Sequence, residues 1–122
     1  MAIIKTFQDL QVWQKSHQLT LNIYKITSLF PKQELFSITN QIRRAAYSVP
    51  ANIVEGFRRR SLRDSLNFYN IADASLEELK YFLLLSKDLE YFNLEIYQKT
   101  LEQTEEVGRL LTRWIQSQRQ YL

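Results

Sequence analysis

The sequence from Leu35 to Arg59, LFSITNQIRRAAYSVPANIVEGFRR, predicts the fold more directly than any other stretch of the chain. Its apolar side chains recur at steps of three and four residues, the spacing that places them on one side of an α-helix. Pro50 lacks a backbone donor and crowds the preceding turn, so we expect a kink near Tyr47–Pro50. The alternative is a break at which Ser48 caps a new helix. The apolar stripe consists of Leu35, Ile38, Ile42, Ala45, Val49 and Ile53.

The segment before this stretch, from about Phe7 to Phe30, carries apolar residues on two sides of a predicted helix. Thr6 and Asp9 have the spacing of a capping box, and Pro31 marks the end of the helix. Two apolar sides hint at oligomerisation, and the alternative is a wide core stripe in a monomer. One side holds Leu10, Trp13, His17, Leu21 and Tyr24, and the other holds Val12, Leu19, Ile23, Ile26 and Phe30.

Two more helical patterns follow. One begins with a capping box formed by Ser61 and Asp64, and the other begins near Asn93, a favourable N-cap residue. Gly108, on the apolar side of the last pattern, suggests a close approach of two helices, and the alternative is a tolerated weak point. The two stripes comprise Leu62, Leu66, Tyr69, Ala72, Leu76, Leu79 and Leu83, and then Leu94, Tyr97, Leu101, Gly108, Leu111 and Ile115.

Length and composition support four helices. The chain has 122 residues, with two glycines and two prolines, which leaves little room for hairpins or long loops. Long helices joined by short loops become antiparallel neighbours. The sequence therefore predicts an all-α protein in which residues 1–122 form a single domain, an antiparallel up-down-up-down four-helix bundle with a Pro-kinked second helix.

The sequence lacks the features of several protein classes. Without cysteine there is no disulfide framework, thiolate catalysis, zinc ribbon or iron–sulfur cluster. The longest apolar run, Tyr81–Leu85, is too short to cross a bilayer, and the N-terminus has no secretory pattern. We therefore expect a cytoplasmic protein without a membrane partner.

Candidate catalytic and metal-binding residues are few. The chain has a single histidine, His17, and no Glu-x-x-His motif, which excludes the di-iron sites found in some helical bundles. With only Gly56 and Gly108 it has no glycine-rich phosphate loop. Adjacent acids such as Glu77 and Glu78 point about 100° apart on a helix and do not converge. We therefore predict no catalytic residue, no metal and no cofactor, and we expect His17 to lie in the core or an interface with a hydrogen-bond partner.

Charge is distributed unevenly along the chain. Residues 41–63 contain six arginines and one acid, a local net charge of +5, whereas residues 73–106 contain nine acids and three lysines, a local net charge of −6. Guanidinium groups match phosphate oxygens with a planar fork of donors. The arginines are therefore candidates for binding a nucleic-acid backbone without reading its sequence. They are Arg43, Arg44 and Arg58, predicted to project away from the apolar stripe, and Arg59, Arg60 and Arg63, near the turn into the third helix.

Several motifs occur in an order that resembles a known family: FQDLQVW at residues 7–13, QIRRA at 41–45, SVPANIVEG at 48–56 and RRS at 59–61. Over nearly its whole length the chain is similar to the 23S rRNA-intervening sequence proteins, also called the S23 family.

The resemblance implies a bacterial source, a bent second helix and a ring-shaped homopentamer. Some members of the family are encoded inside insertions in 23S rRNA genes. A related branch supplies the accessory protein of diversity-generating retroelements, which binds nucleic acid and a reverse transcriptase. The resemblance implies no catalytic residue. It implies that Pro50, Asn52, Glu55 and Gly56 serve the bend or a subunit contact, Asn52 and Glu55 through hydrogen bonds.

Two departures from the family pattern are mild. Val54 stands where alanine is usual, and Ser37 stands where glycine is usual.

Two functions are open at this point. The first is a non-enzymatic, oligomeric protein that binds the RNA or DNA backbone through the arginine cluster. The alternative is a protein-interaction scaffold, such as a reverse-transcriptase accessory protein, whose arginines hold subunits together. Glu55 and Arg59 illustrate the second reading, because their i, i+4 spacing allows an ion pair on one helix.

Overall fold

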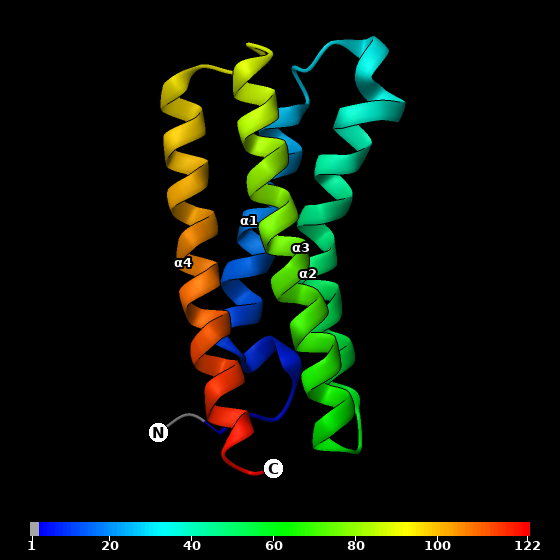
Figure 1. Ribbon diagram of the computed structural model, residues 1–122, viewed down its shortest axis with the longest axis vertical. Coiled ribbons are helices and arrows are strands. Elements are labelled where there is room, and N and C mark those ends of the chain that lie inside the picture. The colour runs from blue at the N-terminus through cyan, green and yellow to red at the C-terminus, as the bar shows by residue number, and fades with distance from the viewer. Residues whose placement is uncertain (1–2) are drawn as a thin grey trace.

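The computed structural model describes residues 3–122, which form four long α-helices. Helix α1 spans Gln11–Thr27, α2 spans Asn40–Arg58, α3 spans Leu62–Asp88 and α4 spans Leu94–Arg119. Successive helices run in opposite directions, with α1 packed against α2 and α4, and α3 packed between α2 and α4 (Figure 1). The predicted all-α, up-down-up-down bundle is confirmed.

The first helix is shorter than the sequence pattern predicts. Phe7–Asp9 form a single 3-10 turn, Leu10 is extended, and α1 begins only at Gln11 and ends at Thr27. The capping box forms on this short turn, because the Asp9 carboxylate accepts the backbone N–H of Thr6 at 2.9 Å. Backbone hydrogen bonds to the carboxylate, first from Thr6, lower the pKa of Asp9. The motif is therefore used as predicted, but it caps the turn that precedes the helix.

The second helix is interrupted at a different place from the predicted one. A 3-10 turn at Lys32–Glu34 leads into a π-helical turn at Leu35–Thr39, where Ser37 has a non-helical backbone with φ −123° and ψ −114°. Helix α2 then continues through Pro50 to Arg58. A break capped by Ser48 is therefore wrong, and the extent of bending at Pro50 stays a prediction.

A side chain from α1 compensates for the donor that Pro50 lacks. A residue at position 50 would normally donate its N–H to the carbonyl of Ala46, four residues earlier. Instead, the Thr20 hydroxyl lies 3.2 Å from that carbonyl oxygen, and both residues are buried. The same hydroxyl lies 2.9 Å from the carbonyl of Ser16, so its one proton serves two acceptors. This contact also ties α1 to α2.

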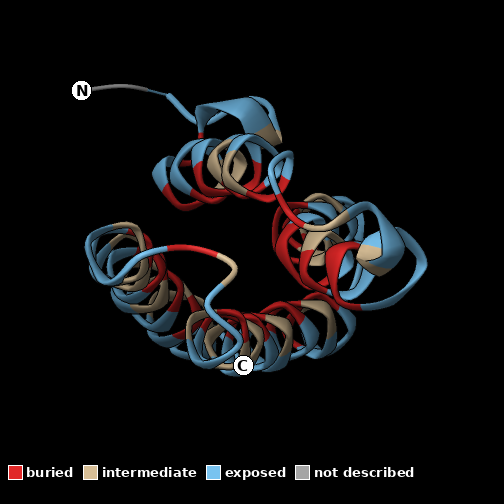
Figure 2. Ribbon diagram, turned by 90° about the horizontal axis from the view of Figure 1, so that it is seen from above, coloured by how far each residue is buried: buried red, intermediate tan, exposed pale blue. Residues whose placement is uncertain are grey.

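The buried residues lie on the sides of the helices that face the inside of the bundle (Figure 2). Of the two apolar sides predicted for α1, the side with Leu19 and Ile23 forms the core. On the other side, Leu21 and Tyr24 are 51% and 42% exposed. The second apolar side of α1 is therefore a partly exposed surface of this chain.

Two threonines occupy core positions of α4 that the apolar pattern did not identify. Thr100 and Thr104 are buried, and the Thr104 hydroxyl donates to the carbonyl of Thr100 at 2.7 Å. Threonine satisfies its hydroxyl within its own helix in this way, so it can occupy an apolar interior. Leu94, predicted to be part of the stripe, is 57% exposed.

Both glycines lie where two helices approach each other. A Cβ atom at Gly56 would lie 2.8 Å from Cδ1 of Tyr69 and closer still to Cε1, and it would lie 3.0 Å from the backbone oxygen of Ser65. At Gly108 a Cβ atom would lie 3.3 Å from a methyl carbon of Leu76. The contact between α2 and α3 thus requires glycine far more strictly than the contact between α3 and α4.

Candidate nucleic-acid interface

The six candidate arginines fall into two groups, one in the first turns of α2 and one around the turn that follows it. Arg43 and Arg44 lie in the first two turns of α2, whereas Arg58 is its last residue. At about 1.5 Å per residue, the distance along the helix from Arg44 to Arg58 is about 21 Å. Arg59 and Arg60 follow in the turn, and Arg63 lies in the first turn of α3. We call Arg58, Arg59, Arg60 and Arg63 the arginine corner.

The prediction that Arg43 projects away from the bundle is wrong, because its side chain contacts the end of α1. Its Nε donates to the Thr27 hydroxyl at 2.9 Å, and one Nη donates to the carbonyl of Tyr24 at 3.4 Å. Its guanidinium group also lies over the Tyr24 ring, 4.8 Å from the centroid. Neighbouring positions on a helix differ in direction by about 100°. Arg43 therefore faces the C-terminal end of α1, while Arg44 faces outward.

Arg59 is partly neutralised within the chain. Its guanidinium group lies 2.6 Å from the Glu55 carboxylate, the i, i+4 ion pair that the sequence predicts. The same group stacks on the Phe68 ring, 4.4 Å from the centroid. Both partners of the ion pair are about half exposed, so solvent screens their attraction. Arg59 is thus held in place at the corner and keeps part of its surface in water.

The other four arginines remain available to a ligand. Within residues 3–122, no ion pair, hydrogen bond or stacked ring engages the guanidinium groups of Arg44, Arg58, Arg60 or Arg63. All four residues are exposed. Arg44 borders a small cavity of about 330 Å³, to which Ser75 and Glu78 of α3 contribute. The remaining three belong to the arginine corner.

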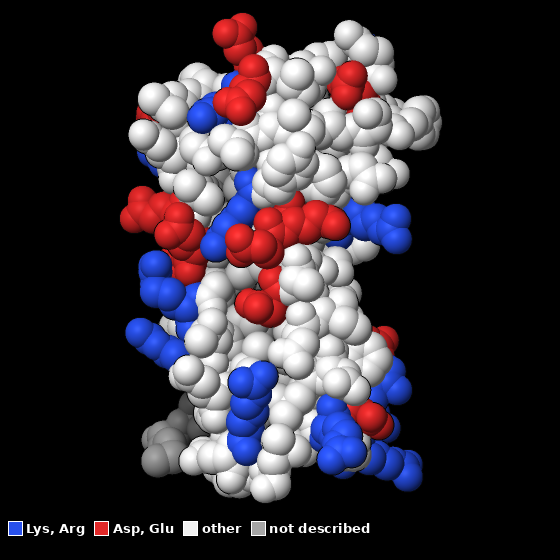
Figure 3. Space-filling model, in the orientation of Figure 1, with Lys and Arg blue, Asp and Glu red and all other residues white. Residues whose placement is uncertain are grey.

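Charge is separated along the length of the bundle. In the face shown in Figure 3, acidic side chains gather across the middle and basic side chains gather toward the end that holds the turn between α2 and α3. Exposed acids of α3 and α4 contribute to this separation, among them Glu77, Glu78 and Glu105. A polyanion approaching the molecule is therefore attracted to the end with the arginine corner and repelled by the middle.

The predicted structural residues of α2 make contacts within this one chain. The Asn52 side chain donates to the carbonyl of Ser48 at 2.7 Å and lies 3.0 Å from its hydroxyl oxygen. That hydroxyl is 2.9 Å from the hydroxyl of Ser75 on α3. Asn52 therefore belongs to a polar chain that links α2 to α3 beside Pro50, whereas Glu55 pairs with Arg59.

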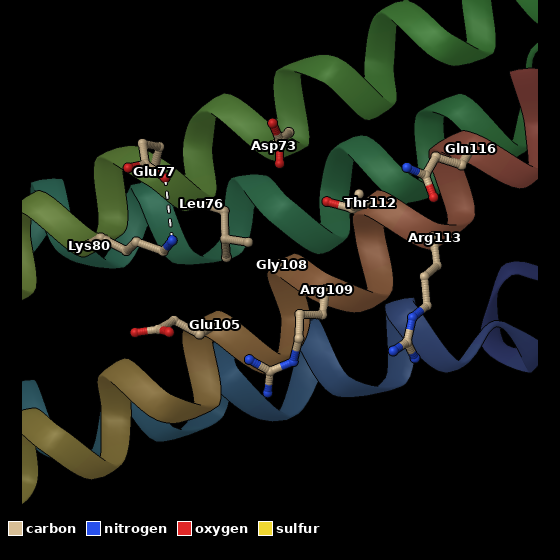
Figure 4. A pocket seen from close by; sticks show the side chains of 10 residues that line it. All are labelled: Asp73, Leu76, Glu77, Lys80, Glu105, Gly108, Arg109, Thr112, Arg113 and Gln116. Atoms are coloured by element: carbon tan, nitrogen blue, oxygen red, sulfur yellow. Dashed lines mark ion pairs between the residues drawn. The ribbon is translucent and has the colours of Figure 1, made fainter.

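A groove lies on the surface between α3 and α4 (Figure 4). It has a volume of about 480 Å³, and Gly108 and Leu76 contribute to its lining. Its rims carry both signs of charge, including a Lys80–Glu77 ion pair of 3.4 Å. Arg109 and Arg113 point away from α3 in this view. The groove therefore presents no concentrated charge of one sign to a ligand.

The only histidine of the sequence has no metal-binding neighbours. His17 is half-buried and stacks on Trp13 with ring centroids 5.0 Å apart. In the part of the chain that the structure describes, no three His, Asp or Glu side chains are grouped to hold a metal ion. Between residues 3 and 122, no helix combines the length and the apolar character needed to cross a membrane.

Sequence reasoning missed several exposed aromatic side chains, because it assigned most aromatic residues to the core. Phe36 is 91% exposed at the turn before α2. Tyr47 on α2 and Tyr81 on α3 are also exposed. Tyr47 lies three residues after Arg44, a spacing that places both on the outer side of α2 and that the sequence could have shown.

Family comparison agrees with this architecture. The model of the 23S rRNA-intervening sequence protein family matches residues 8–113. The chain belongs to this family. A solved structure described as a protein with unknown function from the S23 ribosomal protein family of Bacteroides thetaiotaomicron is 32% identical in sequence, with a TM-score of 0.76. The match covers 85% of this chain and 97% of the other. No curated protein matches the chain.

Proposed function

We propose that this member of the 23S rRNA-intervening sequence protein family is a non-enzymatic, oligomeric protein that binds the backbone of RNA or DNA through the arginine corner. The observation that carries the proposal is the set of exposed, unpaired guanidinium groups of Arg58, Arg60 and Arg63 around one turn. Arg44 adds a further cation along the same outer side of α2.

The corner is suited to phosphate more than to bases. The forked donors of arginine match phosphate oxygens and carry no sequence information by themselves. The guanidinium group of Arg59 covers one face of the Phe68 ring, so that face is not offered for base stacking. The proposal therefore predicts similar affinity for unrelated sequences of the same length.

Fluorescence anisotropy with labelled RNA and DNA tests the proposal. The double variant Arg58→Gln and Arg63→Gln removes two exposed cations of the corner. We expect its dissociation constant at low salt to rise about tenfold, because two phosphate contacts are lost. Unchanged affinity in this variant, or no binding by the unmodified chain at low salt, contradicts the proposal.

A matched control separates a local site from the effect of net charge. Lys25→Gln with Lys99→Gln removes the same charge from exposed positions near the opposite end of the bundle. We expect this control to bind nearly as tightly as the unmodified chain. Equal losses in the two double variants would show that net charge alone governs binding.

A second candidate function is a protein-interaction scaffold in which arginines hold subunits together. Exposed apolar side chains on α2 and α3 favour it, because Tyr47, three residues after Arg44 on α2, is 45% exposed and Ile71 on α3 is 48% exposed. Light scattering distinguishes the two functions. In the scaffold, Arg44→Ala with Arg58→Ala dissociates the oligomer, whereas an unchanged mass rules out this role for the arginines.

A further inference from the structure

A second cationic site lies far from the arginine corner, in the connection between α1 and α2. A cavity of about 300 Å³ opens there, which is the lower end of the range for small-molecule sites. Phe30, Pro31 and Leu35 give it an apolar wall, and the cations Lys32 and Arg43 contribute to its lining. None of the residues that line this cavity carries a carboxylate. We call it the elbow cavity.

Arg43 is held in position at this cavity. The Thr27 hydroxyl accepts from its Nε, and the carbonyl of Tyr24 accepts from one Nη. A guanidinium group has five N–H donors, so three remain for a ligand. Because the side chain is already fixed by these contacts and by stacking on Tyr24, little conformational freedom is lost when a ligand binds.

Thr39 supplies an independent observation. This residue lines the elbow cavity, is 3% exposed, and has a hydroxyl oxygen without a hydrogen-bond partner among the described residues. A buried hydroxyl that lacks a partner is costly, and such groups are uncommon in folded proteins. Rotation about the Cβ–Oγ1 bond turns the hydroxyl hydrogen toward an acceptor placed next to this oxygen.

The backbone at the cavity is irregular as well. Thr39 ends the π-helical turn that contains the non-helical Ser37. Single π-helical turns are frequent at functional sites, because they redirect side chains that a regular helix would place elsewhere. The first and last residues of this turn, Leu35 and Thr39, thus both line the cavity, and Thr39 carries the unpartnered hydroxyl.

We propose that the elbow cavity binds a phosphate monoester with a small apolar body. Two cations and no carboxylate match a dianion, the apolar wall matches the body, and the Thr39 hydroxyl donates to an oxygen of the phosphate. This inference goes beyond the proposed function. It does not depend on the arginine corner, because Arg43 and Arg58 are fifteen residues, or about 22 Å, apart along α2.

Isothermal titration calorimetry with phenyl phosphate and the full chain tests the site. We expect phenyl phosphate to bind at least tenfold more tightly than inorganic phosphate, which lacks the apolar body, or phenol, which lacks the charge. Thr39→Val keeps the shape of the side chain and removes the hydroxyl, so it should remain folded. We expect it to weaken phenyl phosphate binding three- to tenfold, and Lys32→Gln to weaken it about tenfold.

Arg44→Gln is the matched control, because it removes an exposed cation next to Arg43 that does not line the elbow cavity. Its affinity should stay within twofold of the unmodified chain, as should that of Arg58→Gln with Arg63→Gln. The proposal is overturned if phenyl phosphate does not bind, or if Arg44→Gln weakens binding as much as Lys32→Gln. It is also overturned if Thr39→Val leaves the affinity unchanged while the variant melts as a folded protein.

The source of the phosphate is identified by competition. A 5′-phosphorylated oligonucleotide that displaces phenyl phosphate, when its 5′-hydroxyl counterpart does not, supports the site and assigns it to a strand end. Displacement by small phosphate monoesters alone supports the site and assigns it to a free small molecule.

Discussion

At the scale of single residues, Gly56 makes the strictest demand of the fold. A methyl group there would overlap the ring of buried Tyr69 and press on the backbone of Ser65, and neither can move aside easily. We expect Gly56→Ala to lower the free energy of unfolding by about 1–3 kcal/mol, the usual cost of overpacking a core. Urea denaturation measures this loss.

Gly108→Ala is the matched comparison. Its new methyl group would meet only the end of the flexible Leu76 side chain, at 3.3 Å. Alanine also favours a helix interior over glycine by about 1 kcal/mol. We expect unchanged or slightly higher stability, so equal losses at Gly56 and Gly108 would contradict the packing argument.

Glu90 has a backbone conformation that is unfavourable for its residue type. Its φ of 62° lies in the left-handed region, just after the end of α3, and the N–H of Tyr91 reaches back to the carbonyl of Ser86 at 2.9 Å. This is the helix end at which glycine is favoured. We expect Glu90→Gly to raise the free energy of unfolding by about 0.5–1 kcal/mol, as measured by thermal denaturation.

The same substitution within a helix supplies the control. Glu102 is exposed within α4, where glycine destabilises by about 1 kcal/mol. We therefore expect Glu90→Gly to raise the free energy of unfolding and Glu102→Gly to lower it. A loss of stability at both positions would show that the left-handed backbone of Glu90 carries little strain.

At the scale of the helices, Thr20 of α1 and Pro50 of α2 form a coupled pair. Thr20→Val leaves the carbonyl of Ala46 buried without a donor, and we expect a loss of about 1–3 kcal/mol. In a Pro50→Ala background, the new backbone N–H can donate to that carbonyl. Thr20→Val should therefore lower the free energy of unfolding by less than it does in the unmodified chain. A double-mutant cycle measured by urea denaturation should give a coupling energy of about 1 kcal/mol. Additive effects would show that the threonine does not replace the missing donor.

A feature of a helix could be predicted from the sequence when it arises from residues close together in the chain, and not when it arises from contacts between distant residues. Apolar spacing located the core sides of α2 and α3 because a helix repeats within a few residues. The interruption at Ser37 and the direction of Arg43 were not predictable in this way. Both depend on where α1 ends relative to α2, which is a contact between distant parts of the chain. Likewise, Thr20 showed no pattern that marked it as the partner of a carbonyl on another helix.

At the scale of the whole molecule, the separation of charge should set how binding responds to salt. Of the six candidate arginines predicted from the sequence, Arg43 contacts α1 and Arg59 pairs with Glu55, which leaves four with exposed, unpaired guanidinium groups. Each phosphate contact on duplex DNA contributes about −0.9 to the slope of log affinity against log salt. We therefore expect a slope of about −3 to −4, and about −2 for Arg58→Gln with Arg63→Gln. Anisotropy titrations at several salt concentrations measure both values. A slope that the two substitutions do not change would place the phosphate contacts elsewhere on the molecule.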